Sequence, residues 1–437
     1  MKKQNGEKKV LAIGIIAMFC GSILIPLSQA NSQPEYPLPP PLTSDMTLEE
    51  SMFRRMSIRE FSNETVTDEE LSTILWAACG YQTDGGQTIA GINDIYSGII
   101  YVLKEDAAYK YNPVNHSLVF FKAGDWRDIV GWQYKAPIQL GLCYDKNKAD
   151  AKFGGAELGQ IGQNIQFMAN ALDLGTVVCG QVPPAIGPLK IPENEEGIIV
   201  MPIGHLSNPY NFKNRPLWIS MLPRIQTSSM SLSMVLDTCT EGTSFHGSLT
   251  RTEMSQILWS TYGFSPYLDK SEQEKNAVIR HRTVPSAHGY YPLQMYAVTE
   301  KGIFYYQPNL LVKLITNPVD FLGLPIISFL IKRTSGDHRL ELAEASAQPS
   351  IASAPLIIVS VLDLEMTRPT GRDDLSAEIY HRFWYFEAGA SVHNVLLEAT
   401  SWNLSATIVL PMNASAFQSL LQLDENSLPL FVIPVGR

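Results

Sequence analysis

The sequence predicts two copies of one domain, each with interleaved helices and strands, behind a short targeting segment. The main observation is an internal repeat, in which Thr67–Tyr81 (TDEELSTILWAACGY) returns as Thr250–Phe264 (TRTEMSQILWSTYGF). Further motifs match in the same order to the end of both copies, and the interval between counterparts lengthens from 183 residues at Trp76 and Trp259. Solenoid repeats span about 20 to 50 residues, whereas a repeat of about 200 residues is a whole domain. We therefore expect one domain that was duplicated and fused, with insertions in the second copy.

Residues 1–30 have the features of a targeting segment. Four lysines precede a predominantly apolar run over residues 10–27, and Ser28-Gln-Ala30 places small residues where a signal peptidase reads. The apolar run also approaches the length of a membrane span, so a cleaved signal peptide and an uncleaved anchor both remain open. In either case we expect an extracytoplasmic protein, secreted or membrane-anchored.

Two linkers are expected to separate the leader and the two domains. Residues 31–46 contain five prolines, which favour a stiff, extended linker. The first domain then covers residues 47–218, and the second covers residues 235–437 after a Ser- and Met-rich linker over 219–234. A hydrophobic content of 45% is sufficient for two cores.

The repeated segment is predicted to be a helix with its own start signal. Thr67 and Glu70 form a capping box, in which the hydroxyl and the carboxylate satisfy backbone amides at the helix start. Thr250 and Glu253 repeat this signal in the second copy. Long helices and buried apolar strands are expected to follow in both copies. The expected segments are helices over 156–174 and 388–404, and strands over 138–143, 198–203, 356–361 and 430–435.

Composition excludes two classes of function. A net charge of -10 and a pI near 5.4 argue against a nucleic-acid partner, because phosphate binding requires a concentrated basic surface. The cysteines beyond the leader show neither C-x-x-C pairs nor metal-ligand spacing, so no metal site is expected. Single buried thiols are the simpler expectation for them, although an exported protein could form one disulfide. These cysteines are Cys79, Cys143, Cys179 and Cys239.

Two segments carry a resemblance to a known family. Arg55–Phe61 (RMSIREF) resembles the Arg-Arg-Ser-x-Arg-x-Phe opening of the FMN-dependent nitroreductase superfamily. Arg282–Pro292 (RTVPSAHGYYP) resembles the Arg-Thr-x-Pro-Ser-Ala-Gly-x-x-Tyr-Pro segment of its SagB-type branch. Gln-Asn164 and His-Asn394 match the Gln-Asn of the family's long helix, and both domains end in its Pro-x-Gly strand. The resemblance covers nearly all of the chain beyond residue 48.

The resemblance implies an α+β fold of two nitroreductase-like α/β-sandwich domains, fused as an intramolecular pseudo-dimer without a further obligate oligomer. Family members are usually homodimers with two flavins across the interface. Here the first copy keeps the phosphate arm, whereas Thr240–Phe245 of the second copy has no arginine. The second copy keeps the segment that flanks the flavin ring, whereas the first reads Ala90–Asn93 (AGIN). We therefore expect one FMN site built from both halves.

The resemblance assigns the residues of this site. The phosphate arm is Arg55, Ser57 and Arg59, and the ring segment is Pro285, Ser286, Ala287 and His288, where His288 replaces the family's usual glycine. Cys179, Gly180 and Gln181 fall where a backbone amide approaches flavin N5, and Arg215 is a further candidate for the phosphate. The alternatives are surface arginines, an ordinary turn and a core thiol. His381, Arg382 and Tyr385 could line a substrate cleft or lie on a helix surface.

The expected function is an FMN-dependent oxidoreductase that uses a small-molecule electron donor and acceptor. Flavin chemistry belongs largely to the cofactor, so the sequence assigns no catalytic side chain. The alternative is a flavin-free pseudoenzyme that serves as a cell-surface binding or scaffold domain. Residues 310–333 form an apolar insertion of the second copy. This insertion could be a lid, extra core packing, or a membrane contact over 310–332 together with residues 10–27.

Overall fold

The structure is a computed structural model in which residues 1–33 form a unit apart from residues 34–437. The targeting segment over 1–30 lies outside the described residues. The description below concerns the second unit. The described residues are 33–129, 134–180, 186–210, 212–214, 221–269, 281–308, 327–367 and 377–437.

The first half contains an antiparallel sheet in the strand order β1-β4-β3-β2-β5-β8-β6, with β7 also paired to β8. Central strand β5 pairs with β8 over its whole length, from Ile138 opposite Ile203 to Asp145 opposite Glu195. Their buried apolar residues explain why the predicted strands at 138–143 and 198–203 are confirmed. The strands are β1 (Glu35–Pro37), β2 (Gly98–Leu103), β3 (Ala107–Asn112), β4 (Ser117–Ala123), β5 (Ile138–Asp145), β6 (Leu174–Thr176), β7 (Cys179–Gly180) and β8 (Glu195–His205).

The second half repeats this arrangement in the order β13-β12-β11-β14-β16-β15. The predicted strands at 356–361 and 430–435 are confirmed as β14 and β16, which pair from Leu356 opposite Val435. A short pair, β9 (Phe212–Asn214) with β10 (Tyr267–Asp269), joins the two halves. The sheet strands are β11 (Leu293–Thr299), β12 (Gly302–Gln307), β13 (Phe329–Ser335), β14 (Leu356–Asp363), β15 (Ser405–Ala406) and β16 (Ser427–Gly436).

The two predicted capping boxes are present. In α2 (Asp68–Cys79) and α5 (Arg251–Tyr262), the N-cap threonine and the glutamate three residues later satisfy each other's backbone amides. Trp259 of α5 is buried, and its indole N–H donates to the carbonyl of Phe264 at 2.8 Å. The other helices are α1 (Leu48–Arg54), α3 (Ala151–Ala171), α4 (Leu232–Thr238), α6 (Arg339–Ala345), α7 (Ala377–Ser401) and α8 (Ala414–Leu421), with short 3-10 turns at Gly187–Leu189, Ala287–Gly289 and Pro349–Ser353.

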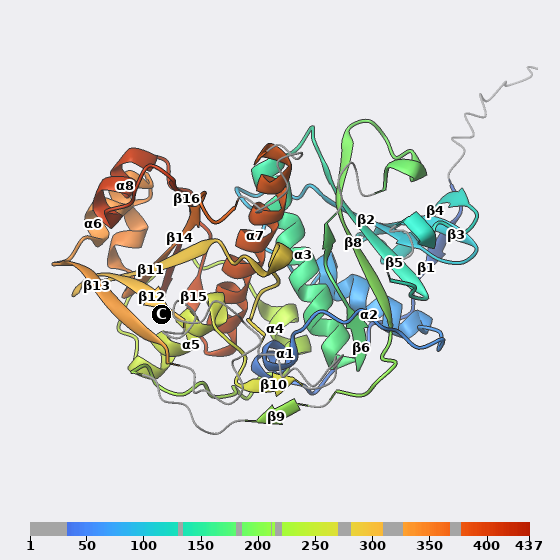
Figure 1. The fold of residues 1–437 in the computed structure, drawn as a ribbon, viewed down its shortest axis with the longest axis horizontal. Coiled ribbons are helices and arrows are strands. Elements are labelled where there is room, and N and C mark those ends of the chain that lie inside the picture. The colour runs from blue at the N-terminus through green and yellow to red at the C-terminus, as the bar shows by residue number, and fades with distance from the viewer. Residues whose placement is uncertain are drawn as a thin grey trace, which may run out of the picture. The chain divides into compact units, whose positions relative to one another are not determined.

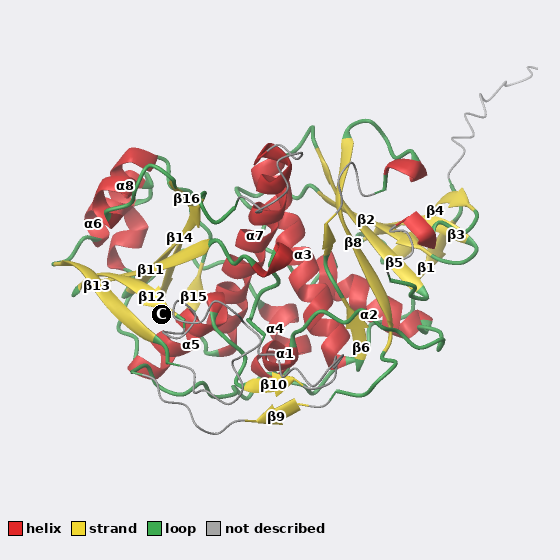
Figure 2. Cartoon of the chain, viewed as in Figure 1, coloured by secondary structure: helices red, strands yellow, loops and turns green. Residues whose placement is uncertain are grey.

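The long helices α3 and α7 lie side by side between the two sheets, so the halves share one interior (Figures 1 and 2). Polar side chains join the helices at the predicted Gln-Asn and His-Asn motifs. Gln163 donates to Asn394 Oδ1 at 3.0 Å, and His393 Nε2 lies 2.9 Å from Asn164 Oδ1. Burial lowers the pKa of His393 to about 3, so the ring is neutral and Nε2 carries the proton that it donates.

The two predicted linkers need correction. Residues 34–46 belong to the folded unit, because Glu35 pairs with Val119 at the edge of the first sheet and Ser44 N donates to Ser233 Oγ at 2.9 Å. The predicted linker over 219–234 contains the start of α4, which is capped by Ser231. An edge strand needs no continuous apolar run and tolerates proline, so the sequence of this proline-rich stretch predicts a linker although the stretch joins the sheet.

The apolar insertion is also narrower than expected. Residues 309–326 lie outside the described residues, but Phe329 to Arg333 belong to β13, which pairs with β12 as β4 pairs with β3 in the first half. The long helices begin earlier than predicted, at Ala151 and Ala377. Helix boundaries depend on packing as much as on local signals.

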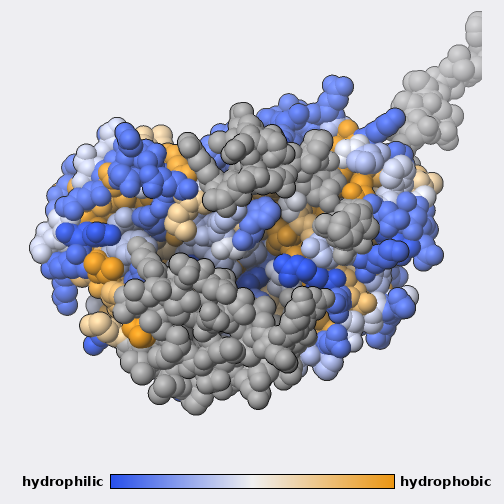
Figure 3. Space-filling model, in the orientation of Figure 1, coloured by the Kyte–Doolittle hydropathy of each residue, from blue (hydrophilic) through white to orange (hydrophobic). Residues whose placement is uncertain are grey.

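Hydrophilic residues form most of the surface over α6 and α8 and over β3 and β4 (Figure 3). No described helix is both long and apolar enough for a membrane span. Cys79, Cys143 and Cys179 are buried free thiols, as expected, whereas Cys239 is a free thiol that is only half-buried.

Candidate functional site

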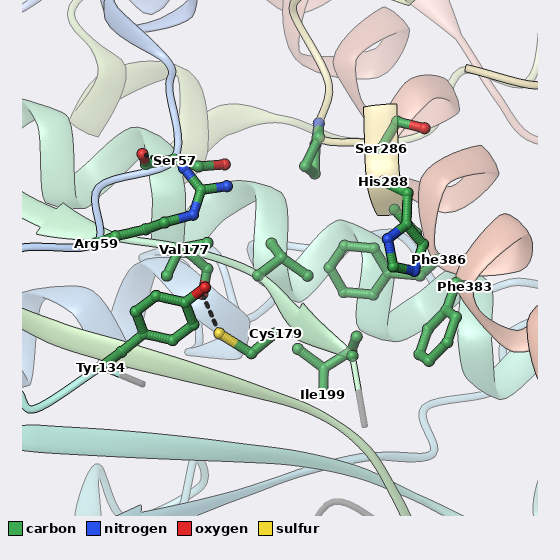
Figure 4. Close-up of a pocket in the computed structure, with 14 residues that line it drawn as sticks. Ser57, Arg59, Tyr134, Val177, Cys179, Ile199, Ser286, His288, Phe383 and Phe386 are labelled. Atoms are coloured by element: carbon green, nitrogen blue, oxygen red, sulfur yellow. Dashed lines mark hydrogen bonds between the residues drawn. The ribbon is translucent and has the colours of Figure 1, made fainter. Parts of the chain in front are cut away.

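A cavity of about 350 Å³ lies between the two halves (Figure 4). Ser57 and Arg59 lie on one side of it, and Ser286 and His288 lie on the other. Thus segments that are more than 200 residues apart in the sequence meet around one space. The lining residues are Ser57, Arg59, Tyr134, Val177, Val178, Cys179, Gly180 and Ile199 from the first half, and Pro285, Ser286, Ala287, His288, Phe383 and Phe386 from the second.

The position of Arg59 follows from the segment after α1. Ile58 N donates to Thr176 O at 2.9 Å, and Phe61 forms a bridge with Leu206, so the chain is held against the edge of the first sheet. Arg59 itself is exposed, with Nη1 3.3 Å from the Ser57 carbonyl oxygen. Its guanidinium therefore offers positive charge and planar donors at the cavity.

Arg55 does not line the cavity, and this corrects the expectation for the arginine arm. Its side chain is 2% exposed and lies in the interface between the halves. Nε donates to Arg282 O at 2.7 Å, and Nη1 donates to Gln166 Oε1 at 3.0 Å. The reason is local, since Arg55 caps the end of α1 and the chain turns there before Arg59. Arg55 therefore joins the two halves.

The second half contributes a tight turn to the cavity. His288 has φ 57°, the left-handed backbone conformation that favours glycine. This explains why the family pattern has glycine at that position. The matching turn of the first half has the same handedness, with φ 55° at Asn93. The Ser286 hydroxyl accepts a hydrogen bond from Tyr291 N at 2.8 Å, which fixes the serine at the cavity wall.

Cys179 on β7 lines the cavity, but its side chain is largely buried. It is therefore better described as a core thiol than as a reactive one. Its Sγ is 3.8 Å from Val177 O, the contact dashed in Figure 4. Burial raises the pKa of Cys179 to about 12, against a smaller lowering by Arg59, so the thiol is protonated at neutral pH. Gly180 also lines the cavity, whereas Gln181 and Arg215 lie outside the described residues.

Besides Val177 and Val178, which precede the predicted Cys179, four lining residues were not foreseen. Phe383 and Phe386 lie on the first part of α7, before the predicted start of that helix. With the correct helix start, their spacing of three residues would have placed both on one face of α7. Tyr134 and Ile199 have no motif that marks them. The nearby candidates His381, Arg382 and Tyr385 do not line the cavity: Arg382 forms an ion pair with Glu196, and His381 packs edge-on against Tyr385.

The equivalent place on the other side of the interface is smaller and acidic. A pocket of about 150 Å³ there is lined by Ala90 from the first half and by Thr240 and Glu241 from the second, among others. Glu241 accepts hydrogen bonds from Ile408 N at 3.0 Å and from the Thr407 hydroxyl at 2.5 Å. The second half thus presents a carboxylate at its smaller pocket, in the place equivalent to that of Ser57 and Arg59 at the larger cavity. This negative charge disfavours the binding of a phosphate.

No group of three or more His, Cys, Asp or Glu side chains within the described ranges is arranged to hold a metal ion. The polar side chains at the larger cavity are the guanidinium of Arg59, the imidazole of His288 and the hydroxyls of Ser57, Tyr134 and Ser286, and apolar side chains such as Phe383 and Phe386 line the rest of its wall. This set can bind an anionic group at one end and a flat, mostly apolar group at the other.

Comparison with known proteins gives the family. A model of the nitroreductase family matches residues 52–186 and 247–437. The chain is 30% identical over 161 residues to MJ1384 of Methanocaldococcus jannaschii, a protein named as a nitroreductase, and this match covers 32% of the chain and 81% of the relative. The chain belongs to the nitroreductase family, and the match in two regions agrees with the internal duplication.

A solved structure shows the same fold over both halves. A crystal structure from Anabaena variabilis, also named for a nitroreductase, superposes with a TM-score of 0.63 and 14% identity over 93% of this chain and 94% of its own. A second structure of that name, from Ralstonia eutropha, is 28% identical and covers 40% of this chain and 91% of its own, with a TM-score of 0.38. The first of these spans both halves, so the two-half architecture as a whole has a counterpart.

Proposed function

We propose that this protein is an FMN-dependent oxidoreductase of the SagB-type branch, with a single flavin site shared by its two repeats. The observation that carries the proposal is that Arg59 of the first repeat and Ser286 of the second line one cavity. Membership of the nitroreductase family supports an oxidoreductase in general. The segment from Arg282 to Pro292 supports the SagB-type branch.

The residues at the cavity fit the cofactor. A volume of about 350 Å³ lies within the range of small-molecule sites. Arg59 and Ser57 would hold the phosphate, since a guanidinium and a hydroxyl donate to phosphate oxygens. Ala287 and Phe386 would cover the apolar ring, and Gly180 would bring its backbone amide near the ring edge. When bound, FMN supplies two-electron transfer, while these side chains orient it and exclude water.

A single site follows from what each repeat has kept. In a nitroreductase homodimer both sites are equal by symmetry, whereas fusion lets one decay. Glu241 beside the smaller pocket would repel a phosphate dianion, so we assign FMN to the larger cavity alone. The chain then acts as an intramolecular pseudo-dimer that needs no second copy.

Location and partners follow from the leader. We propose that the protein is exported, because residues 1–30 have the pattern of a signal peptide or anchor. Soluble nicotinamide donors are scarce outside the cytoplasm, which favours a small-molecule carrier at the membrane as electron donor. The acceptor is a quinone, nitro compound or similar oxidant, and nucleic acid is not a partner.

Purification of the chain tests this function directly. The protein should be yellow, with flavin absorbance and about one FMN per chain. Arg59→Glu and Ser286→Asp, made separately, should each abolish flavin binding, because both sides of the cavity contribute. Arg224→Glu is the charge-matched control, since Arg224 is exposed and lies outside the cavity lining. A protein that stays colourless after addition of FMN would favour the flavin-free binding or scaffold domain.

A further inference from the structure

A buried acid lies directly behind the cavity wall. Glu387 on α7 is 1% exposed, and the Tyr262 hydroxyl donates to its Oε1. The Ser286 hydroxyl, which lines the cavity, lies close enough to the same carboxyl group to lower its pKa. The second oxygen, Oε2, forms no hydrogen bond of ordinary geometry with the described residues. An acid with spare hydrogen-bonding capacity in a dry interior calls for a physical reason.

The duplication supplies an internal comparison. Glu157 is the counterpart of Glu387, since each precedes the asparagine of its long helix, Asn164 or Asn394, by the same interval. Glu157 accepts four hydrogen bonds at 2.6 to 2.9 Å from Ser97 and from Gly98 N. Both of its oxygens are therefore used to anchor the start of β2, and Glu157 has a structural role.

Glu387 has lost that role. The counterpart of Tyr262 in the first half is Cys79, so only the second half places a phenol beside the acid. The Tyr262 hydroxyl accepts a hydrogen bond from Leu293 N at 3.3 Å. In the first half, Glu157 itself accepts the hydrogen bond from the equivalent amide, Gly98 N. The tyrosine thus takes over the strand anchor, and Glu387 is left facing Ser286 and the cavity.

The charges around Glu387 allow it to exchange a proton near neutral pH. Burial raises the pKa of Glu387 to about 7, while hydrogen bonds from Ser286 and Tyr262 and the charge of Arg282 act in the opposite direction. The charged and titratable described groups that face it are Arg282, Tyr262 and Tyr291. Burial raises the pKa of both tyrosines, so neither titrates in this range.

We propose that Glu387, acting through the hydroxyl of Ser286, delivers the proton that an acceptor reduced in this cavity requires. The inference rests on the proposed function and deepens it. Reduction of an acceptor A to AH₂ adds one hydride and one proton. A two-electron donor of the DH₂ class supplies both electrons and releases its protons as it becomes D.

The hydride leaves one negative charge on the acceptor, which takes the proton from Ser286 Oγ as that O–H bond breaks. Ser286 takes the proton of the Glu387 carboxyl, so its hydroxyl is restored and Glu387 becomes a carboxylate. After the product leaves, a solvent proton returns through Ser286 to Glu387. A general acid with a pKa close to the working pH is effective in both stages.

The first test measures the acid without turnover. Infrared difference spectra between the wild type and Glu387→Gln isolate the carboxyl band of Glu387, and a titration from pH 5 to 9 should show its loss around pH 7. Ser286→Ala should move this transition upward, because it removes a donor that lowers the pKa. A band that is unaffected by Ser286→Ala would overturn the link between the two residues.

The second test measures the pH profile of turnover with p-benzoquinone as acceptor. In the wild type the rate of acceptor reduction should fall as pH rises above about 7. Glu387→Gln should lower it by about 100-fold and remove this pH dependence. Glu157→Gln is the matched control, because it alters the equivalent acid without a contact to the cavity, and it should keep the wild-type profile.

The outcomes separate the two proposals. A colourless protein whose Glu387 band still responds to Ser286→Ala removes the flavin function and with it the proton delivery. A yellow, active protein in which Glu387→Gln keeps the wild-type pH profile overturns the relay and leaves the flavin function in place. Should Glu387→Gln fail to fold, Ser286→Ala answers the same question, since it should also lower the rate and flatten the profile.

Discussion

The backbone of Gly389 on α7 lies against the carbonyl oxygen of Ala156 on α3, where a Cβ atom would come within 1.8 Å of that oxygen. The contact is repeated with the roles exchanged, since a Cβ at Gly159 would lie 2.0 Å from the carbonyl oxygen of Phe386. Two helices can approach this closely only where a side chain is missing. The pair of contacts sets the distance between the halves, and with it the width of the cavity.

Alanine at either glycine should therefore separate the halves. We expect Gly389→Ala and Gly159→Ala each to reduce the free energy of unfolding by about 3 kcal/mol or more, because backbone atoms cannot yield as a flexible side chain can. Denaturant unfolding measures this change. Gly85→Ala is a useful control, since its φ of 93° strains a side chain but nothing lies within 4 Å of a Cβ there. Equal losses at Gly85 and Gly389 would show that strain, and not helix contact, is responsible.

The two arginines of the predicted phosphate arm should behave differently on substitution. Arg55→Met removes the donors to Arg282 O and to Gln166, which leaves buried acceptors unpaired, so the free energy of unfolding should fall by about 2 kcal/mol or more. Arg59→Met should change stability little, because Arg59 is exposed, yet it should weaken FMN binding. Thermal unfolding and FMN titration of both variants make the comparison. Loss of stability in Arg59→Met with normal binding would reverse these roles.

These arginines also show how far sequence reasoning reaches. Capped helices such as α2 are predictable because Thr67 and Glu70 lie within one turn, and buried strands are predictable from continuous apolar runs. Arg55 and Arg59 carry the same local signal. Only the end of α1 at Arg54 and its packing decide which of them turns inward.

The aromatic wall of the cavity illustrates the same limit. Phe383 and Phe386 were missed because α7 begins at Ala377 and not at the predicted residue 388. The early turns of α7 are held by packing against the first half, which no local capping signal reports. By contrast, the meeting of Arg59 with Ser286 at one cavity could be expected, because it follows from the complementary losses in the two repeats.

The turn at His288 should be improved by glycine. A non-glycine residue with φ 57° costs about 1 kcal/mol, and His288→Gly removes this strain without loss of a buried contact, since the side chain lies at the cavity. We expect the variant to be at least as stable as the wild type and to bind FMN at least as tightly. Asn93→Gly is the matched control in the other repeat, where asparagine tolerates φ 55° better and the gain should be smaller. Weaker FMN binding by His288→Gly would instead assign the imidazole a direct contact.

Buried Glu398 should make stability depend on pH. It lies on α7 near the buried carboxyl of Glu49, and it accepts hydrogen bonds from Gln256 at 2.8 Å and from the Trp402 indole at 3.1 Å. Burial, and then the charge of Glu49, raise its pKa well above the ordinary 4.5. The folded protein therefore holds a proton that the unfolded chain releases. Stability from this group is complete below about pH 4.5 and is lost as pH rises toward the folded pKa.

Glutamine at position 398 should remove that part of the pH dependence, because it cannot ionise. We expect urea unfolding to show a smaller loss of stability between pH 5 and 9 for Glu398→Gln than for the wild type. The variant should gain most at the alkaline end, where the wild type must hold a carboxylate in a dry interior beside Glu49. Glu425→Gln, at an exposed position, should follow the wild-type curve. If the free energy of unfolding depends on pH in the same way for Glu398→Gln and the wild type, Glu398 has the same protonation state in the folded and the unfolded chain across this range.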